Sequence, residues 1–175
     1  MQIYTNLSAV YRIWISSLIG IVVGMIGGVI RIGWEVLFPL VLRENLGEIA
    51  QIMMSFIHIT PEILQMRYVL DNGYEWHILY LLWQFCFSIF FAMLYVILVE
   101  FYVKLKFAFG ILYGCMIWIL CYMLFLPLFG FVESLENQNI SYFIASLCEC
   151  ILWMWIIELS RRDLRNRITQ ERDPL

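Results

Sequence analysis

The chain has 175 residues, of which 63% are hydrophobic and only 14% are charged, and its formal net charge is −3. A water-soluble domain of this length could not bury so much apolar surface in one core, so the composition excludes an ordinary soluble domain and indicates a membrane protein. Sequence motifs of α/β-hydrolases, zinc proteases and phosphate-binding loops are absent, so the chain is not predicted to be an enzyme.

Four apolar runs are long enough to cross a bilayer, which takes about 20 helical residues. They predict spans over about residues 13–36, 77–103, 107–130 and 140–160, within a single membrane domain covering residues 1–175. Because each run is continuous and does not alternate between apolar and polar residues, helices are favoured over a β-barrel. The predicted fold is therefore an all-α membrane protein, a bundle of four transmembrane helices.

The first span carries small residues at every fourth position, namely Ser16, Gly20, Gly24 and Gly28. Such a stripe lets a neighbouring helix approach closely, because packing rather than hydrophobicity drives helix association in lipid. It predicts tight packing within the chain, which we favour because such stripes are common, or else a homodimer or gating contact. Gly110 and Gly114 predict a second, weaker packing stripe on the third span.

The outer loop between the first two spans, residues 37–75, is predicted to hold two short amphipathic helices. Apolar side chains over residues 46–57 recur at helical spacing, with polar residues on the opposite face. Residues 60–62 (Thr-Pro-Glu) have the pattern of a helix start, and Asn72 followed by Gly73 has that of a helix stop. Both helices are expected to lie on the outer membrane surface or to cap the bundle.

Basic residues are distributed unevenly between the two ends of the predicted spans. They occur before the first span, between the second and third, and after the fourth, as Arg12, Lys104, Lys106, Arg161, Arg162, Arg165 and Arg167. Because basic residues are retained in the cytoplasm, this bias predicts cytoplasmic N- and C-termini, with residues 161–175 as a cytoplasmic tail. The two lysines and the four C-terminal arginines are further expected to anchor the protein in anionic lipid headgroups. Nucleic acid is not an expected partner, because the basic patch is short and its position already suits a membrane.

Charged residues inside the spans are the candidates for a functional site. Glu149 lies about halfway along the fourth span, where a lone carboxylate costs roughly 3 kcal/mol to insert, so it must be protonated, hydrated or paired. Arg31 and Glu35 lie one helical turn apart near the outer end of the first span. Since side chains lean toward the N-terminus of their helix, Arg31 and Glu149 are expected to meet, with Gln84 as a further polar partner. Two interpretations stay open, a structural ion pair and a site that handles protons or ions.

Ion pairs are also predicted at the inner boundary, where Glu100 and Lys104, and likewise Glu158 and Arg162, stand four residues apart. The five cysteines fall within the spans without a paired motif, and the two histidines are isolated. Neither a metal site nor a cofactor is therefore predicted.

Several short motifs follow one another along the chain. They are residues 87–92 (FSIFFA), Glu100 with Lys104-Leu-Lys106, residues 127–130 (PLFG), and a tail that runs from Trp153-Met-Trp155 to residues 161–169 (RRDLRNRIT). In these motifs the sequence resembles the YagU family of small bacterial inner-membrane proteins, weakly over residues 13–36 and well over residues 84–169.

This resemblance implies a four-helix protein of the bacterial inner membrane, with no established molecular activity and a loose link to acid tolerance. Positions that hold histidines in the later spans of other family members hold Gln84, Tyr122 and Cys150 here. The resemblance therefore does not support a histidine-based proton or metal role.

Three classes of function remain in competition. The leading one is a non-enzymatic accessory or stress-related membrane protein, acting with a second copy or another membrane protein, because packing signals outnumber chemical ones. The alternative is a small proton- or ion-coupled transporter or channel that uses Glu149, Arg31 and Glu35, although four spans without an internal repeat are atypical of transporters. A membrane enzyme ranks last, for lack of a nucleophile–base or metal constellation.

Overall fold

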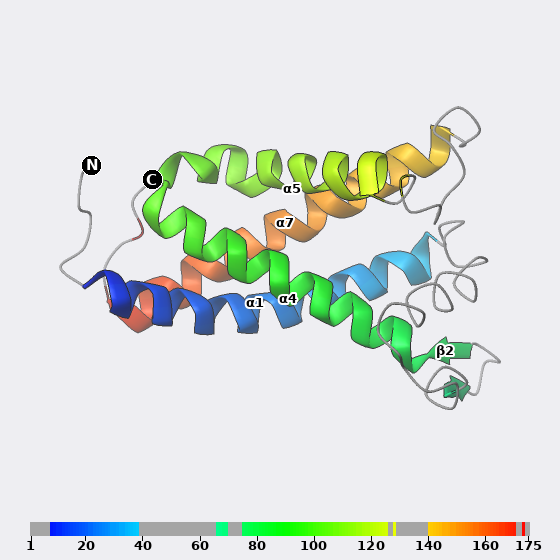
Figure 1. Cartoon of the computed structure of the whole chain (residues 1–175), viewed down its shortest axis with the longest axis horizontal. Coiled ribbons are helices and arrows are strands. Elements are labelled where there is room, and N and C mark those ends of the chain that lie inside the picture. Colours follow the sequence, from blue (N-terminus) through cyan, green and yellow to red (C-terminus); the bar gives the residue numbers. More distant parts are fainter. Residues whose placement is uncertain are drawn as a thin grey trace.

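The computed structural model describes residues 8–38, 66–69, 75–125, 128, 140–170 and 173. Within them, four helical stretches are long and apolar enough to cross a membrane, namely Ala9–Leu37, Leu81–Phe101, Val103–Phe125 and Ile140–Thr169. They lie side by side in an elongated bundle (Figure 1). The predicted fold class, a bundle of four transmembrane helices, is confirmed.

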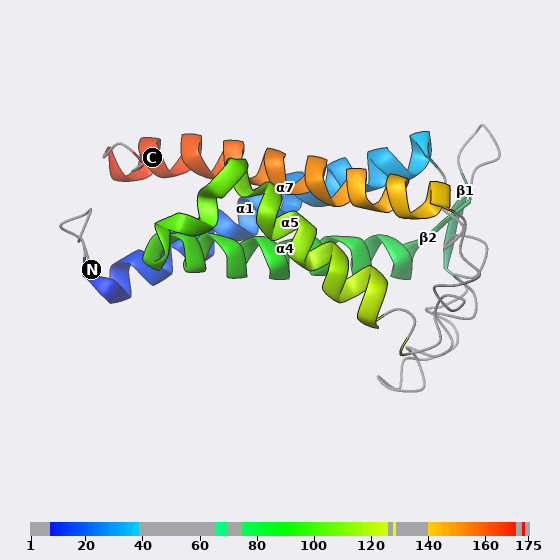
Figure 2. The ribbon, with the colours of Figure 1, turned by 90° about the horizontal axis from the view of Figure 1, so that it is seen from above.

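The first and second spans are the helices α1 (Ala9–Leu37) and α4 (Ile78–Phe101). The third span consists of α5 (Ile111–Trp118) followed directly by a π-helical segment, η3 (Ile119–Phe125). The fourth span is α7 (Ile140–Thr169). The start of α1 and the end of α7 lie at one end of the bundle (Figure 2). We call this the terminal end.

The helix α7 is longer than predicted, because it continues through the arginines of the expected tail to Thr169. Residues from 161 onward were expected outside the bundle, yet Arg161 and Arg165 are both buried. The two arginines stand four residues apart and so share one face of the helix. This face packs into the bundle, and the packing keeps the tail helical.

The small residues of α1 pack against α4. A Cβ atom on Gly20 would lie 2.5 Å from Cα of Met93, and one on Gly24 would lie 2.5 Å from Cα of Ile89. A Cβ atom on Gly28 would meet the ring of Phe85 at 2.7 Å, and Ser16 is buried on the same helix. The stripe therefore serves close packing within the chain, the first of its two interpretations.

The second glycine stripe is not a helical stripe, and this prediction needs correction. Gly110 ends the turn η2 (Val103–Gly110) and has a φ of +79°, after Ala108 and Phe109 with φ values of 52° and 55°. Three successive left-handed residues reverse the chain between α4 and α5, and glycine takes this conformation without strain. Gly114 does lie in α5, where a Cβ atom would be 2.8 Å from the carbonyl oxygen of Cys150 on α7.

A small antiparallel sheet lies at the opposite end of the bundle. Strand β1 (Arg67–Val69) pairs with β2 (Glu75–His77), with Arg67 opposite His77 and Val69 opposite Glu75. The helix predicted to end at Asn72 is therefore wrong over Arg67–Val69. An Asn-Gly pair between short runs rich in aromatic and β-branched residues signals a hairpin as well as a helix stop. The predicted helix over residues 46–57 lies outside the described residues.

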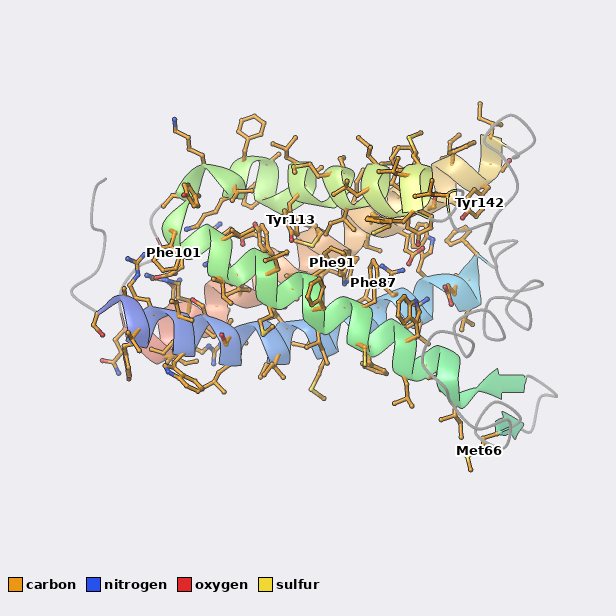
Figure 3. All side chains as sticks on the ribbon, in the orientation of Figure 1. Met66, Phe87, Phe91, Phe101, Tyr113 and Tyr142 are labelled. Atoms are coloured by element: carbon orange, nitrogen blue, oxygen red, sulfur yellow. The ribbon has the colours of Figure 1, made fainter. Side chains whose placement is uncertain are left out.

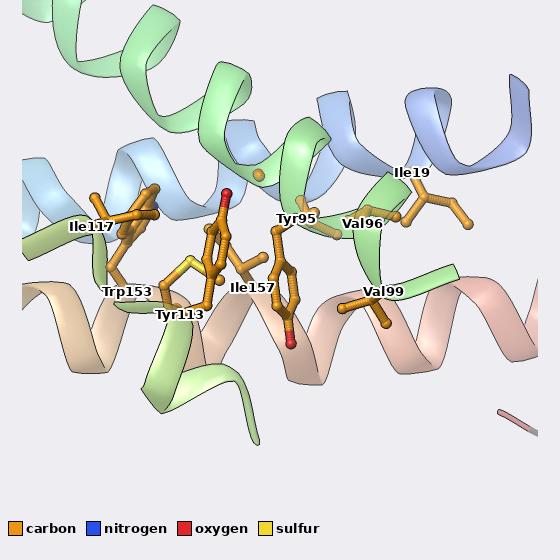
Figure 4. Close-up of a cluster of buried hydrophobic side chains, with 11 residues drawn as sticks. Ile19, Tyr95, Val96, Val99, Tyr113, Ile117, Trp153 and Ile157 are labelled. Carbon is orange, nitrogen blue, oxygen red and sulfur yellow. The ribbon is translucent and has the colours of Figure 1, made fainter. Parts of the chain in front are cut away.

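The core joins all four spans. The rings of Tyr95 on α4 and Tyr113 on α5 have centroids 4.9 Å apart. Figure 4 shows both in one cluster with Trp153 and Ile157 of α7. Side chains also project from the outer faces of the helices (Figure 3). The exposed large apolar residues include Trp14, Leu18 and Met25 of α1. A bundle that is apolar both inside and outside is suited to lipid and not to water.

Candidate functional site: a charged network inside the bundle

Arg31 is the centre of a polar network within the spans. Its side chain is buried, and its Nε donates a hydrogen bond to Oε1 of Gln84 on α4 at 2.9 Å. Its Nη2 lies 3.1 Å from Oε1 of Glu149 on α7 and donates to the hydroxyl of Tyr122 on η3 at 3.2 Å. Side chains from the three other spans thus hold one guanidinium group of α1.

Glu149, the second charged member, is only 1% exposed. Its Oε2 accepts a hydrogen bond from the hydroxyl of Tyr122 at 3.3 Å, so Tyr122 bridges the two charged groups. The hydrogen bond from Tyr122 and the charge of Arg31 partly offset the desolvation of the carboxylate, which alone would make this position unfavourable.

Glu35 joins the network through Gln84. The amide Nε2 of Gln84 donates to Oε1 of Glu35 at 2.8 Å, while the amide oxygen accepts from Arg31. A continuous path therefore runs from Glu35 through Gln84, Arg31 and Tyr122 to Glu149. It connects a half-buried carboxyl group near the end of α1 with a carboxyl group in the interior.

Aromatic rings complete the surroundings of Arg31. The guanidinium carbon lies 4.6 Å from the ring centroid of Phe87 and 5.2 Å from that of Trp153, within the range of cation–π attraction. The Trp153 ring is itself fixed, because its Nε1 donates to Oγ of Ser88 at 2.8 Å and that hydroxyl donates to the carbonyl of Gly24 at 2.7 Å. The network is thus held in place by a second layer of hydrogen bonds.

The structure brings together the four polar residues that the sequence singled out within the spans, Arg31, Glu35, Gln84 and Glu149. Only the family resemblance pointed to Tyr122, as one of the positions that hold histidine in other members; Gln84 is another such position. The side chains of both residues accept hydrogen bonds from Arg31. Tyr122 lies in the π-helical segment η3. Such a segment inserts an extra residue into a helical turn and re-aims the side chains around it, which hydropathy does not reveal.

A second charged cluster lies at the terminal end, and it buries two of the predicted lipid anchors, Arg161 and Arg165. Arg161 is 1% exposed and binds the carboxylates of Glu158 and Asp173, with shortest distances of 2.6 Å to each. Arg165 is also buried and donates to both carboxylate oxygens of Glu100 at 3.0 Å. These two arginines face into the bundle because three carboxylates meet them there: Glu158 of the same helix, Glu100 of α4, and Asp173 beyond the end of α7.

The predicted boundary pairs are replaced by other pairs in the same cluster. Glu100 binds Arg12 and Arg165 in place of Lys104, and Glu158 binds Arg161 and the hydroxyl of Tyr95 in place of Arg162. Lys106, a third predicted anchor, contacts Asp173 at 2.6 Å.

Three predicted anchors remain accessible: Lys104 is exposed, the Arg162 side chain is 31% exposed, and that of Arg167 is 75% exposed. Their contact with lipid headgroups stays a prediction.

Comparison with known proteins places these residues in a family. The family model described as "Protein of unknown function (DUF1440)" matches residues 25–159. The inner membrane protein YagU of Escherichia coli (strain K12) is 38% identical over 88 residues, which make up 50% of this chain and 43% of that protein. The match therefore spans less than half the length of the curated relative. No solved structure matches the chain.

Proposed function

Because the chain belongs to this family of proteins of unknown function and is a YagU-like, multi-pass inner-membrane protein, we propose that it is a non-enzymatic accessory protein that contributes to acid tolerance. The observation that carries the proposal is the set of bonds around Arg31. One buried guanidinium is held by side chains of the three other spans and by two aromatic rings. The charged groups within the spans thereby serve to hold the bundle together.

The family resemblance suggests the role in acid tolerance. The accessory role is inferred because the polar groups within the spans bind one another and hold the helices together. An accessory protein needs a stable, apolar body in the membrane and a partner, which is a second copy or another membrane protein. The large apolar side chains on the outer faces of α1 and α5, such as Met25 and Leu112, offer such a surface to lipid or to a partner.

Two measurements test this proposal. Affinity purification from native membranes in a mild detergent is expected to yield a stoichiometric complex, and a lone monomer would contradict the accessory role. Cells that lack the protein are expected to survive acid challenge less well than complemented cells. Complementation by Glu149→Gln, which keeps an acceptor for the Tyr122 hydroxyl, is expected to restore survival because the bundle is retained.

The second candidate is a small proton- or ion-coupled transporter. It is favoured by the carboxyl groups of Glu35 and Glu149, which are connected through Gln84, Arg31 and Tyr122, because ionisable residues within spans mark proton and ion pathways. In proteoliposomes, a transporter would carry protons down an imposed gradient, and Glu149→Gln would abolish the flux while the protein still folds. If Glu149→Gln removes both flux and acid tolerance, transport replaces the accessory role.

A further inference from the structure

Asp173 lies where cationic side chains converge on a single carboxylate. Its two oxygens accept hydrogen bonds from Nη1 and Nη2 of Arg161 at 3.2 and 2.6 Å, and Nζ of Lys106 donates at 2.6 Å. Nε of Arg165 lies 3.6 Å away, and Nε of Arg162 lies 4.0 Å away. Four cations from two segments, the turn η2 and the end of α7, therefore surround one small anion. We call these four side chains the cationic cradle.

A carboxylate uses this cradle incompletely. Arg165 approaches Asp173 through Nε, which donates its hydrogen bond to Glu100, and its Nη1 is buried without a hydrogen-bond partner among the described residues. A cavity of about 10 Å³, large enough for one water molecule, lies next to this side chain and is lined by Arg12 and Glu100 but not by Asp173, Lys106 or Arg162. A buried guanidinium N–H with no acceptor is unfavourable, so the arrangement suits an anion with more oxygens than a carboxylate has.

Phosphate meets this requirement. It offers three or four oxygens in a tetrahedral arrangement, and arginine forks bind it through paired hydrogen bonds while lysine adds a point charge. The cradle also lies near the ends of the membrane-spanning helices. Lys106 is in the turn between two spans, and Arg161, Arg162 and Arg165 are near the end of α7, where helix ends meet the headgroup region.

We propose that the cationic cradle is a binding site for the phosphate of an anionic lipid headgroup, and that Asp173 occupies this site when lipid is absent. The Asp173 backbone amide donates to Oδ1 of Asn166 at 2.8 Å, which holds the carboxylate over the cradle. The lipid and Asp173 therefore compete for the same four cations. The site is at the opposite end of α1 from Arg31 and does not depend on the proposed function.

Competition predicts that weakening the hold of Asp173 strengthens lipid binding. Asp173→Asn removes the competing charge, and Asn166→Ala removes only the contact that positions it, leaving every charge in place. If Asp173 occupies the cradle in about nine of ten molecules, either variant raises the apparent affinity for lipid phosphate by up to about tenfold. Adding Lys106→Gln to Asp173→Asn removes one cradle cation and is expected to reverse the gain. Arg167→Gln is the matched control, because Arg167 is exposed and pairs with Asp163 outside the cradle.

The experiment titrates purified full-length protein in neutral detergent with short-chain phosphatidic acid, and measures the lipid-bound fraction by native mass spectrometry. Inorganic phosphate and short-chain phosphatidylcholine are titrated in parallel. Tighter phosphatidic acid binding by Asp173→Asn and Asn166→Ala, with Arg167→Gln unchanged, supports the proposal. Equal binding of inorganic phosphate would assign the cradle to a free anion and overturn the lipid. Unchanged affinity in both Asp173→Asn and Asn166→Ala would overturn the site itself. So would a loss of affinity in Arg167→Gln as large as the loss that Lys106→Gln causes when it is added to Asp173→Asn.

Discussion

At Glu149, the effect of a substitution depends on whether the charge of Arg31 keeps a partner. Glu149→Leu leaves a buried guanidinium without its carboxylate and is expected to lower the free energy of unfolding by about 3–5 kcal/mol. Glu149→Gln keeps a hydrogen-bond acceptor for Tyr122 and is expected to lower it by less. Unfolding of the purified variants in detergent, followed by circular dichroism, measures both effects.

The matched control for Glu149→Leu is the double variant with Arg31→Met. Removing both buried charges together is expected to recover most of the lost stability, because an apolar pair replaces an ion pair at little cost. If the double variant is as unstable as the sum of the two single changes, the two residues do not stabilise the bundle as a pair.

Asp173 gives the terminal end a defined response to acid. Burial opposes its ionisation, but hydrogen bonds and charge from Arg161 and Lys106 outweigh burial and hold the pKa of Asp173 below its ordinary value of 3.8. A carboxyl group with a lowered pKa contributes stability above pH 3.8 and loses it as the pH falls through the lower pKa of the folded state. We expect the melting temperature of the wild type to fall more steeply than that of Asp173→Asn over this acid range. Thermal unfolding at a series of pH values tests this, and parallel curves would contradict it.

Among the helices, α1 and α4 depend on glycine for their close approach. A methyl group on Gly24 would lie 2.5 Å from backbone atom Cα of Ile89, which cannot move without separating the two helices. Gly24→Ala is therefore expected to lower the free energy of unfolding by roughly 1–3 kcal/mol, the usual range for overpacking. The same unfolding measurement reports the change.

Gly33→Ala on the same helix is the matched control. Apart from the backbone of its own helix, no atom of the described residues lies within 4 Å of a Cβ placed there, so only helix propensity is expected to change. A gain of up to about 1 kcal/mol is expected. A similar loss in both variants would show that helix propensity, and not the contact with α4, decides the effect at Gly24.

Hydropathy was sufficient to predict the spans, because lipid requires long apolar helices and the chain supplies four of them. The end of α7 could not be predicted in the same way. Charged residues normally mark the end of a span, whereas Arg161 and Arg165 are matched here by Glu158, Glu100 and Asp173. Partners such as Glu100 and Arg165 are far apart in sequence, so neither helical spacing nor composition reveals them. The site within the spans was more accessible to prediction, because a charge at mid-span demands a partner and few polar residues were available.

The described residues form four spans, an even number, and α1 begins at the same end of the bundle at which α7 finishes. The distribution of basic residues predicts that this end faces the cytoplasm. Single cysteines introduced at Thr5 and Glu136 are expected to react with a membrane-impermeant maleimide from opposite sides of the inner membrane, Thr5 only after the membrane is permeabilised. The unsubstituted protein measures the background from its own cysteines. Reaction of both positions from the same side would contradict the topology.

The bonds around Arg31 also constrain how the protein is made at the ribosome. Arg31 enters the membrane with α1, whereas Tyr122 and Glu149 are synthesised only with the third and fourth spans. Gln84 arrives earlier, with α4, and gives the guanidinium a first hydrogen bond while the rest of the chain is still being translated. A nascent chain released before α7 is made would carry the charge of Arg31 inside the membrane without its partner Glu149. Such truncated products are expected to be recognised and degraded by membrane proteases, so that the last helix decides whether the first three are kept.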